Sequence, residues 1–256
     1  MKIQAPAKLN LSLEVTGKRP DGYHLLESDV IFLSLYDELE FEPAEDLFLN
    51  SNIADNIILK AARSLHPTKG AKIKLRKNIP MGGGLGGGSA DAAATLIVLN
   101  KLWELNLPEK KLYEIALSLG ADVPVCLFSH LQKTNTAHFS GVGEIVTHAS
   151  PRPYWYFLLV NPNKNLPTIN VFREYELGNT APTGHKNDLE YAAIKLVPDI
   201  AHILEFLKST KGNLFARMTG TGSTCFAVYE NIDDATNAAT QVPDNYWKLV
   251  ATQYSY

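Results

Sequence analysis

A run of glycines interrupts the chain between two strongly patterned segments. The segment PMGGGLGGGSADAAATL, residues 80–96, holds six glycines in seven positions, broken only by Leu85. Each glycine adds entropy to the unfolded chain and packs no side chain, so a core gains nothing from such a run. The alternating residues 71–80 before it predict a strand, and the apolar residues from Ser89 onward predict a helix. We therefore explain the run by a ligand that must come close to a backbone without side chains.

A glycine loop between a strand and a helix suits a phosphate group. It aims unpaired backbone N–H groups and the positive end of a helix dipole at one spot. A flexible linker is the alternative, but linkers carry polar residues on both sides, whereas an apolar helix follows here. The dinucleotide pattern is met at Gly82, Gly84 and Gly87, but the glycines make that match nearly automatic, and no acidic strand end follows at its distance. The lysine of a P-loop is missing before Ser89, which we expect at or near the helix N-cap.

The composition indicates an ordinary globular protein. The 256 residues are 45% hydrophobic and 20% charged, which is ample for a buried core. A net charge of −3 gives no overall positive field that would attract nucleic acid or anionic lipid. Cys126 and Cys225 lie in apolar runs, typical of buried reduced thiols, and are too few for a zinc site. Without a signal core or membrane span, we expect a cytoplasmic protein, a monomer or weak homodimer, with small molecules as its partners.

Strand and helix patterns alternate along the chain. In the first part, strands are predicted at 7–15, 29–42 and 71–80, and helices at 56–65, 89–103 and 108–119. The segment ADVPVCLF is predicted to be extended, because Pro124 is unfavourable inside a helix. The apolar run YWYFLLV then predicts a central strand, so we place a boundary near residue 150, between domains 1–150 and 151–256. Beyond it we predict a helix at 199–207, a strand at 225–230, a helix at 233–242 and a strand at 246–252.

The glycine segment resembles the central motif of the GHMP kinases, a family that includes galactokinase and the homoserine, mevalonate and phosphomevalonate kinases. Two further segments agree with that family in place and order: APAKLNLSLEVTGKRPDGYHLLES and ARMTGTGSTCFAVYE. The first of them, with GADVPVCLF and NDLE, is similar to the branch whose acceptor alcohol carries a cytidine diphosphate, in the non-mevalonate isoprenoid pathway. The resemblance runs from Ala5 to Tyr229. It implies an α+β fold of two domains, one like ribosomal protein S5 and one ferredoxin-like, with the active site in the cleft between them.

The resemblance also implies a mechanism. ATP would be the co-substrate with Mg²⁺, whose ligands the sequence does not reveal; Asp122 would be the general base, and Lys8 would lie beside it near the acceptor hydroxyl. From the residues alone, Asp122 between Gly-Ala and Val-Pro is typical of a turn or helix cap, and Lys8 of a solvated strand residue.

Binding residues are carried over in the same way. Those expected at ATP are Lys77, Asn56 and the loop residues Pro80, Met81, Gly82, Gly83, Gly84, Leu85, Gly86, Gly87, Gly88, Ser89 and Ala90. Those expected at the acceptor are Asn10 at the erythritol, Tyr23 and His24 at the cytosine, His185 as a second wall, and Gly220, Thr221 and Gly222 at the diphosphate. Simpler roles remain open for these residues. Lys77 could be an exposed strand lysine and Asn56 a helix cap. Tyr23 could be a core tyrosine, His24 a surface histidine, and residues 220–222 part of a plain tight turn.

Two other functions stay open at this point. The chain could phosphorylate another small alcohol, such as homoserine, mevalonate or a sugar, but those acceptors need no cytosine platform at Tyr23 and His24. It could also be a non-catalytic nucleotide-binding module, but Lys8 and Asp122 beside intact glycine loops favour an enzyme.

Overall fold

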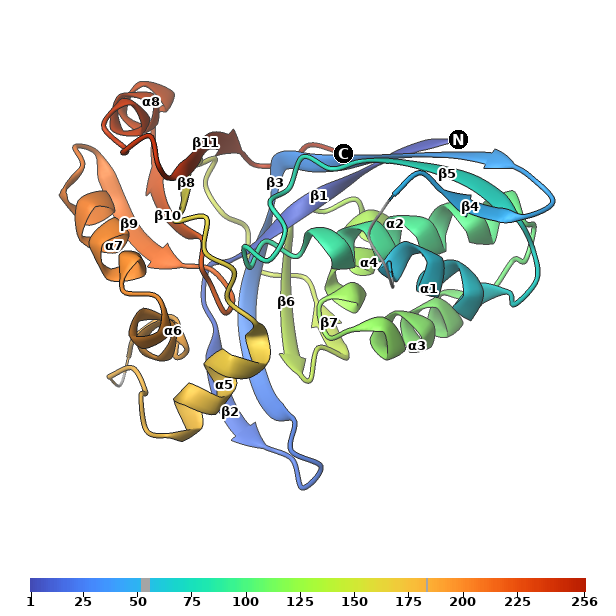
Figure 1. The fold of residues 1–256 in the computed structure, drawn as a ribbon, viewed down its shortest axis with the longest axis horizontal. Coiled ribbons are helices and arrows are strands. Elements are labelled where there is room, and N and C mark those ends of the chain that lie inside the picture. Colours follow the sequence, from blue (N-terminus) through green and yellow to red (C-terminus); the bar gives the residue numbers. More distant parts are fainter. Residues whose placement is uncertain (52–55, 183) are drawn as a thin grey trace.

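The computed structural model describes residues 1–51, 56–182 and 184–256 and places them around two separate sheets (Figure 1). The first sheet contains β1 (Lys2–Asn10), β2 (Glu14–Lys18), β3 (His24–Pro43), β4 (Leu47–Leu49), β5 (Ala71–Arg76), β6 (Thr136–Gly141) and β7 (Ile145–Thr147). The second contains β8 (Tyr156–Asn161), β9 (Asn213–Met218), β10 (Cys225–Tyr229) and β11 (Trp247–Thr252). The helices are α1 (Ile57–Leu65), α2 (Gly87–Leu102), α3 (Glu109–Leu119), α4 (Val123–Gln132), α5 (Thr168–Glu176), α6 (Glu190–Leu196), α7 (Asp199–Ser209) and α8 (Ile232–Thr240).

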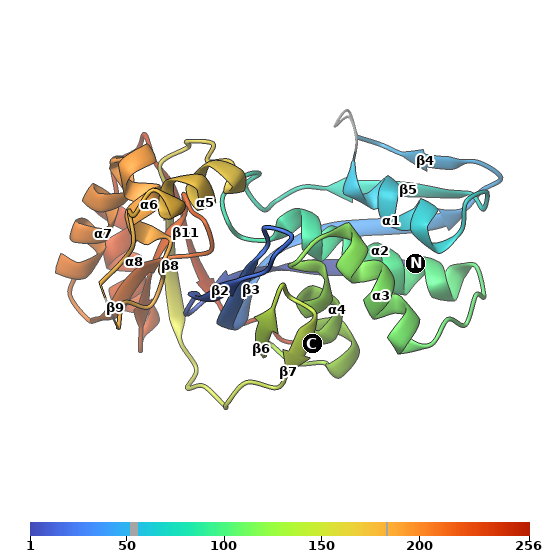
Figure 2. The same cartoon turned by 90° about the horizontal axis from the view of Figure 1, so that it is seen from below.

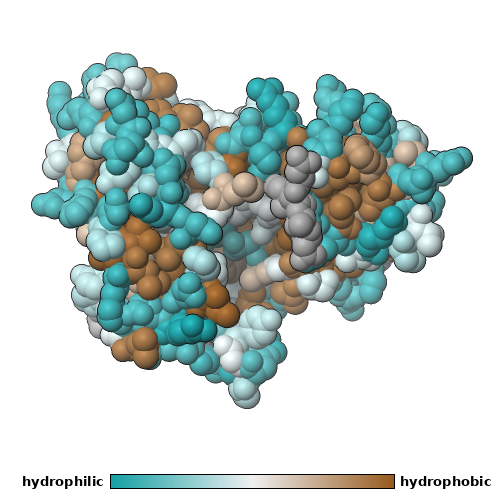
Figure 3. Space-filling model, viewed as in Figure 1, coloured by the Kyte–Doolittle hydropathy of each residue, from teal (hydrophilic) through white to brown (hydrophobic). Residues whose placement is uncertain are grey.

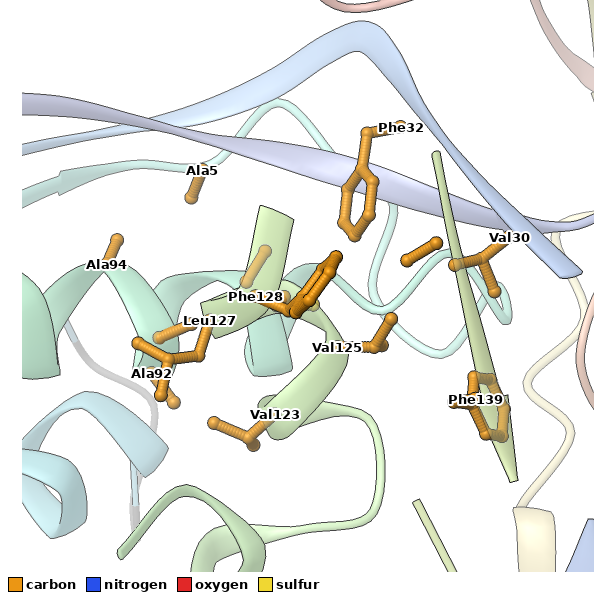
Figure 4. Packing of buried hydrophobic residues seen from close by; sticks show 14 of the residues in the cluster. Ala5, Val30, Phe32, Ala92, Ala94, Val123, Val125, Leu127, Phe128 and Phe139 are labelled. Carbon is orange, nitrogen blue, oxygen red and sulfur yellow. The ribbon is translucent and has the colours of Figure 1, made fainter. Parts of the chain in front are cut away.

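The long strand β3 organises the first half. The path β4-β5-β3-β6-β7 runs through it, and β1 and β2 pair with it as well; only β4 and β5 are parallel. Helix α2 contacts β1 and β3 and is flanked by α1 and α4. Its alanines, among them Ala92 and Ala94, are fully buried, and Figure 4 shows Ala94 below Ala5 of β1 and Ala92 beside Leu127 of α4. Because alanine is small, the helix lies close to the sheet, and its first turn is fixed beside β1.

The sheet of the second half packs against helices α7 and α8 and also against the first sheet. Its strand order is β11-β8-β10-β9, all antiparallel. Helices α7 and α8 contact these strands, while alternate residues such as Phe157 and Phe226 join a separate core cluster with Leu9 and Ile31 of the first sheet. Figure 2 shows α1–α4 in one half and α5–α8 in the other, with β2 and part of β3 between them. The end of β1 therefore lies where the halves meet.

The last residues return to the first half. The Tyr254 N–H donates to the Phe32 carbonyl at 2.8 Å, and the Tyr256 hydroxyl lies 2.5 Å from Ser129 Oγ on α4. The predicted boundary near residue 150 falls between β7 and β8, and it stays a prediction. None of the helices in the described ranges is long and apolar enough to cross a membrane.

Most predicted elements are present, and two local predictions were wrong. The segment predicted to be extended around Pro124 forms α4, because proline is favoured in a first helical turn, where its missing N–H would have no partner. The helix after the glycines begins at Gly87 with Gly86 as its N-cap, so Ser89 lies in the first turn, near the cap as expected. The predicted strand 7–15 is interrupted between Asn10 and Glu14.

Candidate active site

A cleft of about 560 Å³ is lined by residues of both halves. The glycine loop, Lys8 and Asp122 line it from the first half, and residues 220–222 and Phe172 line it from the second. Figure 3 shows the molecule hollowed between the two halves. The first glycine loop, expected at ATP, and the second, residues 219–224, expected at the diphosphate of the acceptor, therefore line one cleft.

The glycine loop adopts a backbone that other residues rarely adopt. Gly82, Gly84 and Gly86 have φ angles of 69°, 74° and 66°. A Cβ on Gly84 would lie 2.8 Å from the carbonyl oxygens of both Thr219 and Gly222, and one on Gly86 would lie 2.6 Å from Lys8 Cγ. The glycines thus let the loop press against β1 and against the second glycine loop while the first amides of α2 stay open to an anion.

Replacing Gly84 with Ala is expected to disrupt the nucleotide site. The new methyl group would meet two fixed carbonyl oxygens from a positive φ, so the loop must shift, and the free energy of unfolding should fall by about 1–3 kcal/mol. We expect KM for ATP to rise at least about tenfold, the effect of losing one charge-assisted hydrogen bond to phosphate. Gly178→Ala is the matched control, because Gly178 has φ 90° but open space around it. Equal behaviour of the two variants would contradict the role given to the contact between loops.

Lys8 and Asp122 form the charged centre of the cleft. Lys8 Nζ lies 3.0 Å from Asp122 Oδ2 and donates to Asn10 Oδ1 at 2.7 Å. The Lys8 side chain is only 4% exposed, so it is not the solvated strand residue that its alternation with leucines allows. Its backbone N–H donates to the Leu85 carbonyl at 3.0 Å, which fastens the glycine loop to β1. Asn10 in turn donates to Ser28 Oγ at 2.8 Å.

The Asp122 carboxylate is available for chemistry. Asp122 occupies the N-cap position of α4, yet its side chain makes no capping hydrogen bond. The carboxylate faces Lys8 instead, and it remains 35% exposed in the cleft. The start of α4 therefore fixes the backbone of Asp122 while its partly exposed carboxylate lines the cleft.

Lys77 joins two buried carboxylates at the other end of the glycine loop. Its Nζ lies 2.5 Å from Asp37 Oδ2 on β3 and 2.9 Å from Asp91 Oδ2 on α2. Burial raises the pKa of Asp91 to about 7; Lys77 lowers this pKa and the charge of Asp37 raises it. Burial also opposes the charge of Lys77, but Asp91 and Asp37 together raise its pKa above the ordinary value.

The raised pKa of Asp91 predicts a pH-dependent stability. A carboxyl group whose pKa rises on folding stabilises the folded state while protonated and loses that contribution as pH rises toward its folded pKa near 7. Relative to Asp91→Asn, the wild type should lose on the order of 2 kcal/mol of unfolding free energy between pH 5 and pH 8. Urea unfolding of both proteins at each pH measures this difference. Parallel curves for the two proteins would contradict it.

The second glycine loop is held from behind by buried polar side chains. The Asn187 amide donates to the carbonyls of Met218 and Gly220 at 2.8 and 3.0 Å. The hydroxyl of Thr219 accepts the Asn10 N–H at 2.9 Å. The Thr224 N–H donates to the Gly83 carbonyl at 3.3 Å. The loop is thus more than a plain tight turn, because it ties β1 to the first glycine loop.

The residues predicted at the cytosine lie at the edge of the cleft or outside it. Tyr23 is 66% exposed in the turn before β3. The His24 ring stacks on Phe172 at 4.6 Å, and its Nε2 lies 3.2 Å from Glu176 Oε1; burial is the main cause of its lowered pKa. His185 lines a separate hollow of about 330 Å³, where its Nε2 lies 3.3 Å from Glu190 Oε1.

The structure brings together most of the predicted nucleotide residues. Lys77, Asn56 and loop residues 80–89 line the cleft, and Asn56 also caps α1, where its Oδ1 accepts the Ile58 N–H at 2.9 Å. Ala90 is fully buried in α2 behind the loop. Gly220, Thr221 and Gly222 line the cleft as well.

Sequence reasoning missed the partners of these residues. Asp91 had a usable signal, because it is the only charge between Gly87 and Asn100 in an otherwise small and apolar helix. Asp37 had a signal as well, because it takes the place of an apolar residue in the series Leu33, Leu35, Leu39 and Phe41 of β3. Thr219 lies in a polar loop, where the pattern gives no sign of its contacts.

Comparisons with known proteins agree with this geometry. The family model described as the GHMP kinases N terminal domain matches residues 52–130, and the GHMP kinases C terminal model matches residues 171–248. The chain is 42% identical to a 4-diphosphocytidyl-2-C-methyl-D-erythritol kinase of Paramagnetospirillum magneticum, over 94% of this chain and 93% of that protein. It is 40% identical to the protein of the same name from Shewanella woodyi, over 96% and 91%.

Solved structures show the same arrangement. A crystal structure of 4-(cytidine 5'-diphospho)-2C-methyl-D-erythritol kinase is 30% identical and covers 99% of this chain and 100% of its own, with a TM-score of 0.83. The Methanococcus jannaschii mevalonate kinase, at 15% identity, shares the fold with a TM-score of 0.71 over 100% and 98% of the chains. Because two family models match more than half of the chain in order, and relatives near 40% identity span almost all of it, the chain belongs to the GHMP kinases, a family of ATP-dependent small-molecule kinases.

Proposed function

We propose that this protein transfers the γ-phosphoryl group of ATP to the 2-hydroxyl of 4-diphosphocytidyl-2-C-methyl-D-erythritol, in the non-mevalonate route to isoprenoid precursors. The observation that supports it best is the 3.0 Å contact between Lys8 and Asp122 at the meeting point of two glycine loops. The names of the full-length relatives support the choice of acceptor.

The glycine loop is proposed to bind the triphosphate. The open amides at the start of α2 and the positive end of its dipole favour an anion beside Gly86 and Gly87. Phosphoryl transfer needs little covalent help, so holding the γ-phosphate in line and offsetting its charge is the main task of this loop. Lys77 and Asn56 line the same cleft beside this loop and are proposed to contact ATP there.

Asp122 is proposed to accept the proton of the acceptor hydroxyl. Its exposed carboxylate can reach a hydroxyl in the cleft, and the ammonium of Lys8 beside it offsets the negative charge that develops on that oxygen. Asn10 orients Lys8 through the 2.7 Å hydrogen bond. The alcohol is proposed to lie between these side chains and the glycine loop.

Mg²⁺ is proposed to arrive with ATP. In the described ranges, no group of three or more His, Cys, Asp or Glu side chains is placed to hold a metal ion. The ion is therefore proposed to be held mostly by phosphate oxygens and water. The hydroxyl of Ser89, in the first turn of α2, is the hydroxyl that the glycine loop offers it. Bound Mg²⁺ would neutralise charge on the transferred phosphoryl group.

The cytidine tag is proposed to bind near the turn before β3. Tyr23 offers an exposed ring, and stacking one base on an aromatic ring is worth about 1–3 kcal/mol. His24 is proposed to read the polar edge of the base, and His185 to close the far side. We further propose that the enzyme acts in the cytoplasm as a monomer or weak homodimer, with small molecules and no nucleic acid as partners.

Release of ADP from MgATP in the presence of different alcohols tests the proposal. We expect turnover with 4-diphosphocytidyl-2-C-methyl-D-erythritol and none with homoserine, mevalonate or galactose. ADP release with one of the other alcohols would keep the kinase and reject the cytosine platform. Binding of ATP without turnover of any of the four would favour a non-catalytic nucleotide-binding module.

A further inference from the structure

The ammonium of Lys77 lies beside Gly87, the first residue of α2. A Cβ built on Gly87 would lie only 3.1 Å from Lys77 Nζ. Lys77 follows β5 and lines the cleft, where its side chain is 24% exposed. The loop has no P-loop lysine in its own sequence, so this ammonium stands where such a charge is needed.

Two carboxylates fix the position of that ammonium. Asp37 is itself anchored, because its Oδ1 accepts the N–H groups of Asn78 and Ile79 at 2.6 and 2.9 Å while its Oδ2 faces Lys77. Asp91 approaches from the opposite side, on the second turn of α2. Lys77 is thereby held between the sheet and the helix whose first turn forms the anion site.

The carboxylate of Asp91 does not stabilise the fold in an evident way. It is 3% exposed, and its Oδ1 is buried without a hydrogen-bond partner among the described residues. A buried carboxylate with one unpaired oxygen costs stability, and the remaining oxygen contacts Lys77. Because Asp91 costs stability and its side chain contacts Lys77, we explain its presence by the position that it gives to the Lys77 ammonium.

We propose that Asp91 is a positioning residue of the nucleotide site, which together with Asp37 holds the Lys77 ammonium against Gly87, where it meets the phosphates of ATP. The proposal deepens the proposed function. It rests on ATP binding in this cleft and is independent of which alcohol is phosphorylated.

The proposal predicts that Asp91 acts through Lys77 on nucleotide binding. Without Asp91 the ammonium keeps one partner and can turn away from Gly87, so the phosphates lose a fixed charge. Asp91→Ala and Lys77→Met should each weaken binding of Mg²⁺ and the non-hydrolysable ATP analogue AMP-PNP about tenfold, the effect of one charge-assisted hydrogen bond. The two changes together should weaken it no more than Lys77→Met alone. KM for ATP should follow the binding, with kcat little changed.

Calorimetric titration with AMP-PNP and Mg²⁺ at pH 8 measures this cycle without any acceptor. Asp91→Asn should bind better than Asp91→Ala, because its amide oxygen still accepts from Lys77. Glu42→Gln is the matched control, since it removes one carboxylate charge from exposed Glu42 on β3, beside Lys74. Its binding should equal that of the wild type. If Asp91→Ala does not fold, the same cycle is run with Asp91→Asn, whose effect should vanish in the Lys77→Met background.

Two results would overturn the proposal. Effects that multiply, to about a hundredfold in the double variant, would mean that Asp91 and Lys77 act separately. Normal AMP-PNP binding by Asp91→Ala, or by Asp91→Asn where Asp91→Ala does not fold, with only a changed urea midpoint, would mean a purely structural pair. Failure of the proposed function looks different, because the acceptor panel would give no product while this cycle keeps its pattern.

Discussion

Asp122→Asn is expected to lower kcat by about 10²–10⁴-fold, because asparagine keeps the shape of the side chain but cannot accept the proton of the alcohol. Binding of AMP-PNP and KM for ATP should stay near their wild-type values, since the glycine loop and Lys77 are untouched. Steady-state ADP release and calorimetric titration measure the two effects separately. The expected signature is thus a loss confined to the chemical step.

The control for this variant is Asp233→Asn, which changes an exposed aspartate in the first turn of α8. Its kcat should equal that of the wild type. If Asp122→Asn kept its kcat, or lost AMP-PNP binding to the same extent as kcat, Asp122 would not be the base.

Lys8→Met is expected to lower kcat by about 10²-fold or more. The ammonium at 3.0 Å from Asp122 is the nearest described positive charge to that carboxylate, and losing one such group at a developing oxyanion typically costs 10²–10³-fold. The variant removes a charge that is 96% buried, so its fold is checked by urea unfolding. ADP release at saturating ATP and acceptor measures kcat.

Lys2→Met on the same strand controls for the loss of a lysine, since Lys2 is 79% exposed in a surface pair with Glu40. Surface pairs of this kind contribute little to stability. A Lys8→Met variant that turned over like Lys2→Met would remove Lys8 from the mechanism.

The fold was predictable where local pattern and tertiary structure agree. Helices with apolar residues at helical spacing and clear stops, such as α3 before Gly120, were predicted almost to the residue. The segment around Pro124 was not, because a proline forbids the middle of a helix but favours its first turn, and only the preceding chain decides between them. The pairing of β1 with the long β3 depends on contacts far apart in sequence, which local pattern does not contain.

The sequence allowed most residues that line the cleft to be predicted, but not the contacts that these residues make with one another. Lys8 and Asp122 are 114 positions apart, and strand alternation alone made Lys8 a surface lysine; the resemblance to a family was needed to pair them. Lys8 is buried because the glycine loop packs on its side of β1, with Gly86 against its side chain and the Leu85 carbonyl on its N–H, and no local pattern indicates this. The contact of the His185 ring with Glu190 is likewise a side-chain contact that no local pattern indicates.

The product of the reaction tests the account most directly. The protein is incubated with MgATP and 4-diphosphocytidyl-2-C-methyl-D-erythritol, and the product is examined by phosphorus and proton NMR. We predict one new phosphate monoester, on the oxygen of carbon 2 of the erythritol, and no such product with Asp122→Asn. A phosphate on another hydroxyl, or unchanged alcohol in the presence of bound ATP, would contradict the placement of the acceptor between Lys8, Asp122 and the glycine loop.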